Sequence, residues 1–334
     1  MLGEGATGER CRVTRRALIA IHAVAVLTCA AAAADAIRSA VTTSGPPRLS
    51  VVEVADLSRL EVGGFKLREL SGLGWSEDDQ VLYAVSDKGV LFHLAFAGTT
   101  TRLQDLNPVH AVRLRGADGR PIDRPQANAE GLAVRNGSNG VHGDDELVVV
   151  LETGPRLSRF STSGAHIEDL PVADALRANA NLQAESRGIE AVAVHPALGA
   201  VTIPERPLAT ERKDRHDLYT RDGKWLSFPA LKGGKGRVKA VEILPDGQLL
   251  VLERMRIPGT DRHRSVPRLL DPGACDGGVC EPRTLEIAGE DIPEGNFEGL
   301  ARLSRDLFIA VSDEIVAEKR KTRFVLFRID GAER

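Results

Sequence analysis

The sequence predicts an all-β protein and, within that class, a β-propeller. From residue 51 onward, short apolar runs are broken by Gly, Asp, Asn and Pro, a pattern of short strands joined by turns, and long helical periodicity is scarce. A strand–turn–strand unit recurs five times, at intervals of 49 to 60 residues. A repeat of this length built on hairpins is typical of propeller blades. At about 50 residues per blade we expect six blades, with five or seven as the neighbouring counts.

A secretion signal is predicted at residues 1–34. Four arginines between residues 10 and 16 precede an apolar run that ends in small side chains, so we expect cleavage after Ala34 by an ordinary secretory route. An uncleaved membrane anchor is the alternative, because the apolar run is long enough for either. Residues 35–50 are small, polar and proline-containing, which predicts a linker and places the domain at 51–334. The mature protein is therefore expected in the periplasm or outside the cell.

The five repeats share one plan. They span residues 71–87, 130–152, 190–205, 239–253 and 298–313. Each begins with a small or charged residue, continues as an alternating apolar strand, turns, and ends a second strand on Asp or Glu. The turn "PDG" of the fourth repeat is a strong hairpin signal, because Gly readily adopts positive φ. Segments 49–57 and 324–330 lie outside the repeats, and we expect them to pair and close the ring as a composite blade.

Two smaller features lie between the repeats. Residues 172–188 are the best helix candidate, only a few turns long. Cys275 and Cys280 are the cysteines left after removal of the signal, in the short loop "CDGGVC". In an exported protein these two are expected to form a local disulfide, since two thiols alone make a poor zinc site.

The ends of each hairpin carry charged residues. A hairpin returns on itself, so the first residue of its first strand and the last residue of its second strand lie at the same end. In a propeller that end is the mouth of the central channel. The expected pairs are Ser71 with Asp87, Glu130 with Glu152, Glu190 with Glu205, Lys239 with Glu253, and Glu298 with Asp313. Eight carboxylates and one ammonium group would then converge on one rim.

So many like charges predict a compensating cation, because neighbouring carboxylates raise one another's pKa until one is protonated. A divalent metal could supply the charge, and so could arginine, since Arg206 and Arg254 directly follow Glu205 and Glu253. Ca²⁺ is the simplest candidate, as a hard ion that takes oxygen ligands and activates water. The expected metal ligands are Asp87, Glu130, Glu190, Glu298 and Asp313. The general-base candidates are Glu152, Glu205 and Glu253, and the candidates for binding an anionic substrate are Arg206, Arg254 and Lys239. Purely structural carboxylates are the alternative.

Five segments carry a family resemblance. They are "SGLGWSEDDQVLYAVSDKG", "AEGLAV", "RGIEAVAV", "KAVEILPDGQLLVLER" and "NFEGLA…AVSDE", in this order. Together, from about residue 66 to 314, they resemble the secreted bacterial phytase-like proteins, a family described by the esterase-like activity of phytase. The resemblance implies a β-propeller and hydrolysis of a phosphate or carboxylic ester. At Glu314 the chain departs from the family's usual Asp-Asp-Asn-type ending. A more distant similarity to lactonase propellers implies that Glu130 and Glu298 bind a central divalent metal.

Other functions are disfavoured by the sequence. The net charge is −3 and there is no basic stripe, which argues against nucleic-acid binding. The chain has no G-x-S-x-G elbow and no H-E-x-x-H motif. We therefore expect an exported, monomeric propeller hydrolase acting on a small anionic ester, a phosphate ester above all. The alternatives are a non-catalytic propeller that binds a ligand or a protein, and a lactonase-type hydrolase.

Overall fold

The computed structural model describes residues 46–98, 101–123, 127–178, 188–231, 235–283, 285–289, 292–316 and 319–331. The predicted signal peptide and most of the predicted linker lie outside these ranges. Strand β1 (Arg48–Asp56) begins three residues before the predicted domain boundary. Within the described ranges, no helix is long and apolar enough to span a membrane.

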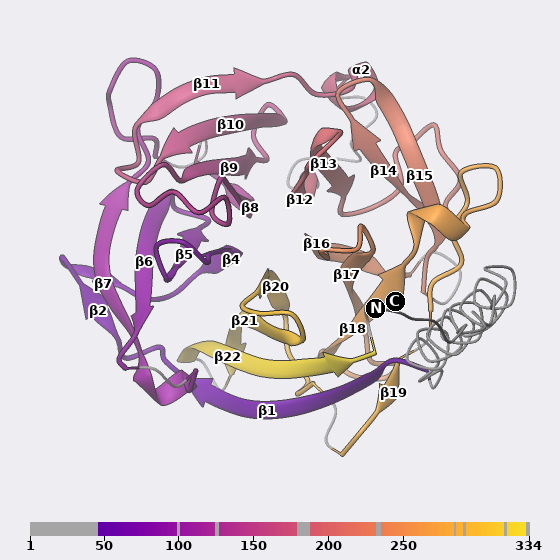
Figure 1. Cartoon of the computed structure of the whole chain (residues 1–334). Coiled ribbons are helices and arrows are strands. Elements are labelled where there is room, and N and C mark those ends of the chain that lie inside the picture. Colours follow the sequence, from indigo (N-terminus) through magenta and orange to yellow (C-terminus); the bar gives the residue numbers. More distant parts are fainter. Residues whose placement is uncertain are drawn as a thin grey trace, which may run out of the picture. The chain divides into compact units, whose positions relative to one another are not determined.

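Five β-sheets follow one another around a central axis (Figure 1). Blade 1 holds β4 (Leu70–Ser76), β5 (Val81–Ser86), β6 (Val90–Phe96) and β7 (Leu106–Arg113). Blade 2 holds β8 (Ala129–Arg135), β9 (Glu146–Leu151), β10 (Arg156–Ser161) and β11 (His166–Leu170). Blade 3 holds β12 (Ile189–His195), β13 (Gly199–Pro204), β14 (Arg215–Thr220) and β15 (Gly223–Pro229). Blade 4 holds β16 (Arg237–Ile243), β17 (Leu249–Arg256) and β18 (His263–Leu270). Blade 5 holds β20 (Phe297–Arg302), β21 (Leu307–Val316), β22 (Lys319–Asp330), β1 and the short β19 (Glu286–Ile287).

The predicted propeller is confirmed, with five blades in the described part of the chain. Six were expected and five was one of the counts left open. The estimate assumed about 50 residues per blade. Long connections, such as residues 114–128 between β7 and β8 and residues 271–296 between β18 and β20, raise the length of most repeats above that value.

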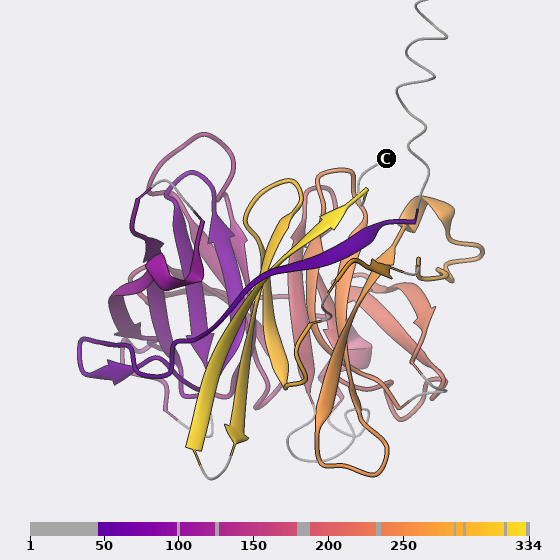
Figure 2. The same cartoon turned by 90° about the horizontal axis from the view of Figure 1, so that it is seen from below.

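The two ends of the domain meet in blade 5. Strand β1 pairs antiparallel with β22, with Leu49 opposite Ile329 and Ala55 opposite Phe324. Figure 2 shows the two strands running side by side across the sheet. The predicted composite blade is therefore confirmed. Because the last strand of the ring is supplied by the beginning of the domain, the sheet cannot open without breaking this ladder.

The core lies between the blades. The inner strands β4, β8, β12, β16 and β20 contact one another in a closed circuit. Each second strand is buried on both faces, as in the "LVVVL" segment of β9, because a neighbouring blade covers each side. Close to the axis there is room for little more than main chain. A Cβ on Gly131 would lie 2.7 Å from the carbonyl oxygen of Glu190 in the next blade.

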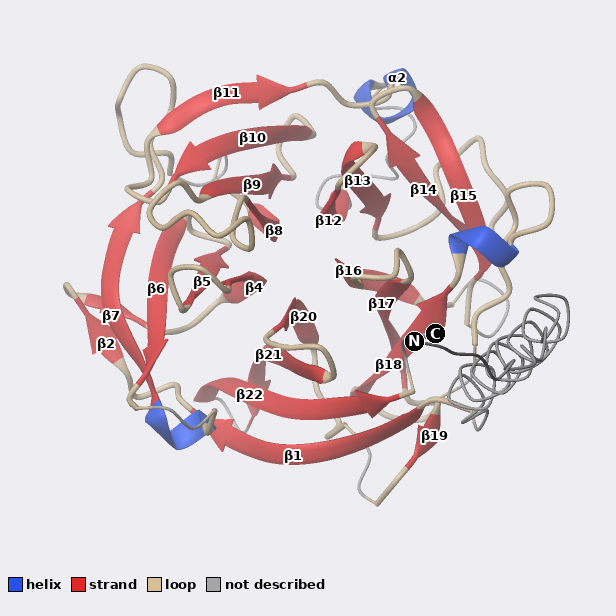
Figure 3. Cartoon of the chain, in the orientation of Figure 1, coloured by secondary structure: helices blue, strands red, loops and turns tan. Residues whose placement is uncertain are grey.

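Helices are few in the described ranges (Figure 3). The predicted helix at 172–188 is reduced to α2 (Asp174–Arg177), and residues 179–187 lie outside the described ranges. Two 3-10 turns, Leu103–Asp105 and Pro272–Ala274, and a hairpin of β2 (Glu61–Val62) with β3 (Phe65–Lys66) complete the connections. The predicted disulfide between Cys275 and Cys280 is confirmed.

Candidate functional site

Every inner hairpin contains a β-bulge at the same place. The register between the two innermost strands shifts at the first residue of each repeat. We name these residues the opener positions: Ser71, Glu130, Glu190, Lys239 and Glu298. A bulge leaves one residue out of the ladder and re-aims its side chain. Five blades thus present one irregular residue each at the same end of the channel.

The bulges also determine which residue of the second strand faces each opener. In blade 3 the residue opposite the start of the bulge is Pro204, and Glu205 follows it. In blade 4 the residue at that place is Glu253, and Arg254 follows it. The same register gives the closer positions Asp87, Glu152, Glu205, Arg254 and Asp313. The predicted pairs are therefore right in four blades and one residue early in blade 4.

Lys239 forms the charged centre of this mouth. Its Nζ makes ion pairs with Glu190, with Glu205 at 3.4 Å and with Glu298 at 3.3 Å, and its side chain is 5% exposed. Burial alone would lower the pKa of Lys239, but the negative charges of Glu190 and Glu298 outweigh burial and raise it. The ammonium group is therefore retained, and it ties blade 4 to blades 3 and 5.

Two asparagines hold the carboxylates of blades 2 and 5. Nδ2 of Asn128 donates to Oε1 of Glu130 at 2.9 Å and to Oε2 of Glu152. Nδ2 of Asn296 donates to Oε1 of Glu298 at 2.7 Å. Each asparagine stands two residues before an opener, in the pattern N-x-E-G. The recurrence of this pattern is the sequence signal that could have identified both asparagines, which the sequence analysis missed.

Two arginines flank one carboxylate. Nη2 of Arg254 lies 3.4 Å from Oε1 of Glu205, and Nε of Arg206 lies 3.6 Å from Oε2 of the same group. Arg254 also donates to Oδ1 of Asn296. Burial works to raise the pKa of Glu205, but the charges of Lys239 and the two arginines lower it. With side chains 18% and 28% exposed, Arg254 and Arg206 are the cations of this mouth most open to solvent.

The pKa values of two other carboxyl groups, Glu190 and Glu130, shift upward. Burial raises the pKa of Glu190 above its ordinary value, although the ion pair with Lys239 opposes the rise. Burial, followed by the charges of Glu190 and Glu298, raises the pKa of Glu130 well above its usual value. The surroundings therefore favour the neutral form of Glu130 and the ionised form of Glu205 within one mouth. We name the connected set the mouth cluster: Asn128, Glu130, Glu152, Glu190, Glu205, Arg206, Lys239, Arg254, Asn296 and Glu298.

Glu253, a predicted general base, does not reach this cluster. It is completely buried and accepts hydrogen bonds from Nε2 of His216 at 2.9 Å, Nη1 of Arg268 at 2.7 Å and the main-chain N–H of Leu231 at 2.8 Å. Strand residues alternate between faces, so Arg254 points to the channel while Glu253 points away from it. Glu253 holds blades 3 and 4 together.

The remaining predicted residues belong to blades 1 and 5. Ser71 carries no charge into the mouth; its Oγ donates to the carbonyl oxygen of Ala129 at 2.5 Å. Asp87 and Asp313 occupy the closer positions of their blades, and the main-chain N–H of Asp313 donates to the carbonyl of Asn296 at 3.3 Å.

The opposite end of the channel has a different character. There the hairpin turns surround a cavity of about 950 Å³, whose walls include Leu132, Val192 and Ile243. Its polar residues include Glu242 and Arg302. Burial raises the pKa of Glu242 to about 7, with Arg302 working against the rise. This end is wide and is lined by polar and apolar residues alike, whereas the mouth cluster is tightly paired and charged.

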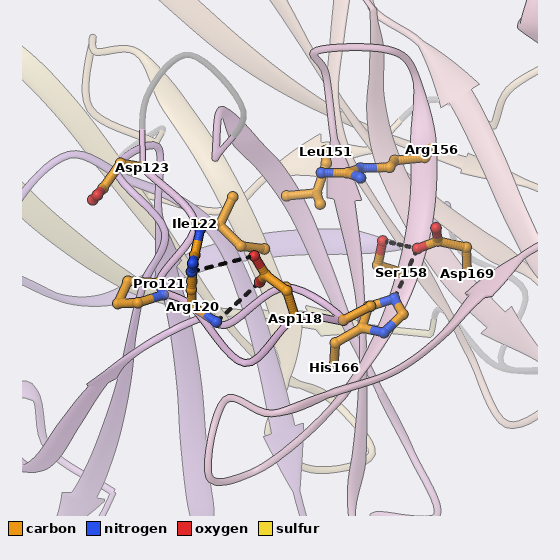
Figure 4. A pocket seen from close by; sticks show the side chains of 12 residues that line it. Asp118, Arg120, Pro121, Ile122, Asp123, Leu151, Arg156, Ser158, His166 and Asp169 are labelled. Atoms are coloured by element: carbon orange, nitrogen blue, oxygen red, sulfur yellow. Dashed lines mark hydrogen bonds and ion pairs between the residues drawn. The ribbon is translucent and has the colours of Figure 1, made fainter.

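A second hollow of about 330 Å³ lies away from the axis, beside blade 2 (Figure 4). Oγ of Ser158 and Nε2 of His166 both bond to Oδ1 of Asp169, at 2.6 and 3.0 Å. This order differs from a catalytic triad, in which the histidine lies between the serine and the carboxylate. Ser158 is also almost completely buried. These three residues are best understood as a structural hydrogen-bond set.

Comparison with known families now assigns the chain. The model of the phytase-like family, described as "esterase-like activity of phytase", matches residues 66–313. The chain belongs to the phytase-like family. The match begins at the end of β3 and ends at Asp313, so it takes in all five inner hairpins and every opener and closer position of this phytase-like propeller.

Other comparisons add little. No curated protein matches the chain. Among solved structures, the crystal structure of the β-propeller domain of Cps50 (Swd1) from Myceliophteria thermophila is 13% identical, with a TM-score of 0.36, over 79% of this chain and 85% of that chain. The likeness is weak, and the propeller architecture rests on the five sheets of the phytase-like chain itself.

The mouth cluster does not fit the divalent cation that was predicted there, although membership of the phytase-like family is compatible with calcium. Three carboxylates from two blades already converge on Nζ of Lys239, so a positive charge of the protein stands between them. Within the described ranges, no three side chains of His, Cys, Asp or Glu are arranged to hold a metal.

Proposed function

We propose that this protein is an exported hydrolase of an ester bearing an anionic group, such as a phosphate ester, and that the mouth cluster is its active site. The observation that carries the proposal is the contrast between Glu130 and Glu205. Their surroundings drive their pKa values in opposite directions within one connected cluster. Such a contrast assigns an acid and a base. Family membership supports hydrolysis, and the disulfide is compatible with export.

Substrate binding would fall to the arginines. Arg206 and Arg254 flank Glu205 and are partly exposed, so the anionic oxygens of a substrate could bind both guanidinium groups. Lys239 would contribute positive charge from its buried position while it keeps its ion pairs with the glutamates. This arrangement favours a substrate that brings negative charge to the mouth, and it disfavours a neutral carboxylic ester.

The chemical step can then be written with the residues present. Glu205, as the ionised carboxylate, accepts a proton from a water molecule while the water oxygen attacks the phosphorus or carbonyl carbon. The bond to the leaving oxygen breaks, and protonated Glu130 donates its proton to that oxygen. The charge that develops in the transition state is stabilised by Arg254 and Arg206.

A substrate panel tests this function. p-Nitrophenyl phosphate, p-nitrophenyl acetate and a lactone are each incubated with wild-type protein, E205Q, R254Q and the control K224Q, with and without chelator. Lys224 lies on the outer strand β15, where it is exposed and forms an ion pair with Glu211. We expect turnover of the phosphate ester, a kcat about 10²- to 10⁴-fold lower in E205Q, a higher KM in R254Q and no change in K224Q. No turnover of any substrate by folded wild-type protein would overturn the proposal.

A non-catalytic binding propeller is the second candidate, and one observation favours it. The charged groups of the mouth already pair with one another, since Lys239 contacts three carboxylates and Arg254 two acceptors. Phosphate binding that is lost in R254Q, with no turnover in the panel, would identify this alternative. The lactonase-type interpretation needs a central metal where Lys239 stands, and turnover of the lactone alone would favour it.

A further inference from the structure

We propose that Lys239 is the resident cation of the central site, and that a variant without its ammonium group binds a divalent cation between Glu190, Glu205 and Glu298. The inference concerns what balances the buried charge. It does not depend on whether the mouth cluster hydrolyses an ester. It differs from the site predicted from sequence, in which a calcium ion or arginine was expected to balance the carboxylates.

The first support is the equivalence of the blades. The bulges place Lys239 and Arg254 at the opener and closer positions of blade 4. Blades 2 and 3 carry Glu at both of these positions, and blade 5 carries Glu298 and Asp313. Blade 4 therefore has two basic side chains at the two places where three other blades have two carboxyl groups. The carboxyl groups at the opener and closer positions are therefore balanced by basic residues at the same positions of blade 4.

The second support is the geometry around Nζ. Oε1 of Glu190, Oε1 of Glu205 at 3.4 Å and Oε1 of Glu298 at 3.3 Å all face the same nitrogen. The three side chains are 6%, 9% and 19% exposed, so solvent screens their charges poorly. With Lys239 in place these side chains are not arranged to hold a metal, but carboxylate oxygens are ligands that hard cations accept. The position between them is filled by an ammonium group.

The third support is energetic. Removing one member of a buried ion pair leaves the other charge uncompensated, which is strongly destabilising. Without Lys239, the carboxylates must either take up protons or bind another cation. Ca²⁺ binds carboxylate oxygens at about 2.3–2.6 Å, so only a small contraction around the vacated position would be needed.

The experiment compares calcium binding by four proteins. They are wild type, K239Q, K239E and K239R, each measured by isothermal titration calorimetry and by thermal unfolding with and without CaCl₂. We expect no single-site binding and no change in Tm for wild type and K239R. For K239Q and K239E we expect one bound Ca²⁺ and a Tm raised by about 5 °C when calcium reaches one hundred times Kd. A further E298Q substitution should weaken the binding at least about tenfold, because it removes one ligand.

Two results would overturn the proposal. One is wild-type protein that binds one Ca²⁺ and loses it on E298Q substitution, because the metal would then share the site with Lys239. The other is K239Q and K239E proteins that are folded and show no binding at millimolar calcium. If neither variant folds without metal, refolding in CaCl₂ followed by circular dichroism decides: recovery of the native spectrum with calcium supports the proposal, and failure to recover contradicts it.

Discussion

Glu253 and Arg254 are neighbours in strand β17, and their side chains leave it on opposite sides. Glu253 is sealed between blades 3 and 4 with His216 and Arg268, while Arg254 reaches Glu205 in the channel mouth. One residue of register thus separates a structural carboxylate from a cation of the candidate site.

These neighbours should respond differently to substitution. We expect E253Q to lower the free energy of unfolding by about 3–5 kcal/mol, because Arg268 would keep its charge in a buried place without an ionised partner. R254Q should cost much less stability and should instead weaken phosphate binding. Urea denaturation and phosphate titration measure the two effects. An E253Q protein as stable as wild type but inactive would show that Glu253 belongs to the active site.

Asn128 is expected to act through the two carboxyl groups that it bridges. N128A removes the donor, and we expect it to lower the free energy of unfolding by about 1–3 kcal/mol. N128D replaces the donor with a third carboxyl group beside Glu130 and Glu152, so it should destabilise the fold more than N128A does. Asn107 is exposed, and its side chain donates to the carbonyl of Asp105 two residues away. N107A therefore serves as the matched control and should change stability by no more than about 0.5 kcal/mol. Thermal unfolding at neutral pH makes the comparison. N128D with the Tm of wild type would contradict the account.

Gly131 is expected to tolerate no side chain. Its Cβ would lie 2.7 Å from the carbonyl oxygen of Glu190, an atom of the main chain that cannot move without shifting β12. G131A should therefore lower the free energy of unfolding by about 1–3 kcal/mol. At Gly116 the nearest atom to an added Cβ is the mobile carboxylate of Asp118 at 3.2 Å, so G116A is the control. Equal stabilities of the two variants would contradict the close approach of blades 2 and 3.

Much of the fold could be predicted from the sequence, because the hairpins repeat. The alternation of apolar runs and turns predicted the inner strands of all five blades. Two strand-like segments outside the repeats predicted the pairing of β1 with β22. The number of blades was harder, since loop length between blades varies and leaves no periodic signal. The disulfide followed from the spacing of Cys275 and Cys280.

The site was only partly predictable. Glu130, Glu190, Glu205 and Glu298 were expected at the mouth and converge there. The residue facing Lys239 was placed one position early, at Glu253, because an acidic residue was expected at the end of every second strand, whereas blade 4 carries Arg254 there. That Lys239 takes three carboxylates, instead of standing beside a metal, depends on distances across three blades, which strand patterns do not contain.

Glu242 predicts a pH dependence of stability. Its pKa is raised from 4.5 to about 7 in the folded protein, so the protonated form is favoured by folding. This contribution is complete below about pH 4.5 and is lost as the pH rises through 7. Because Glu242 is only half-buried, we expect a moderate effect. Between pH 4.5 and 7.5 the free energy of unfolding of wild type should fall by about 1–3 kcal/mol relative to that of E242Q. Urea denaturation across this range measures it, and parallel pH profiles would contradict the raised pKa.

The most direct test of the whole account is a crystal structure of the wild-type protein soaked with phosphate and calcium together. We predict phosphate oxygens on the guanidinium groups of Arg206 and Arg254, with Lys239 still between Glu190, Glu205 and Glu298 and no calcium among them. Calcium bound by these carboxylates, with Lys239 displaced and phosphate elsewhere, would contradict it.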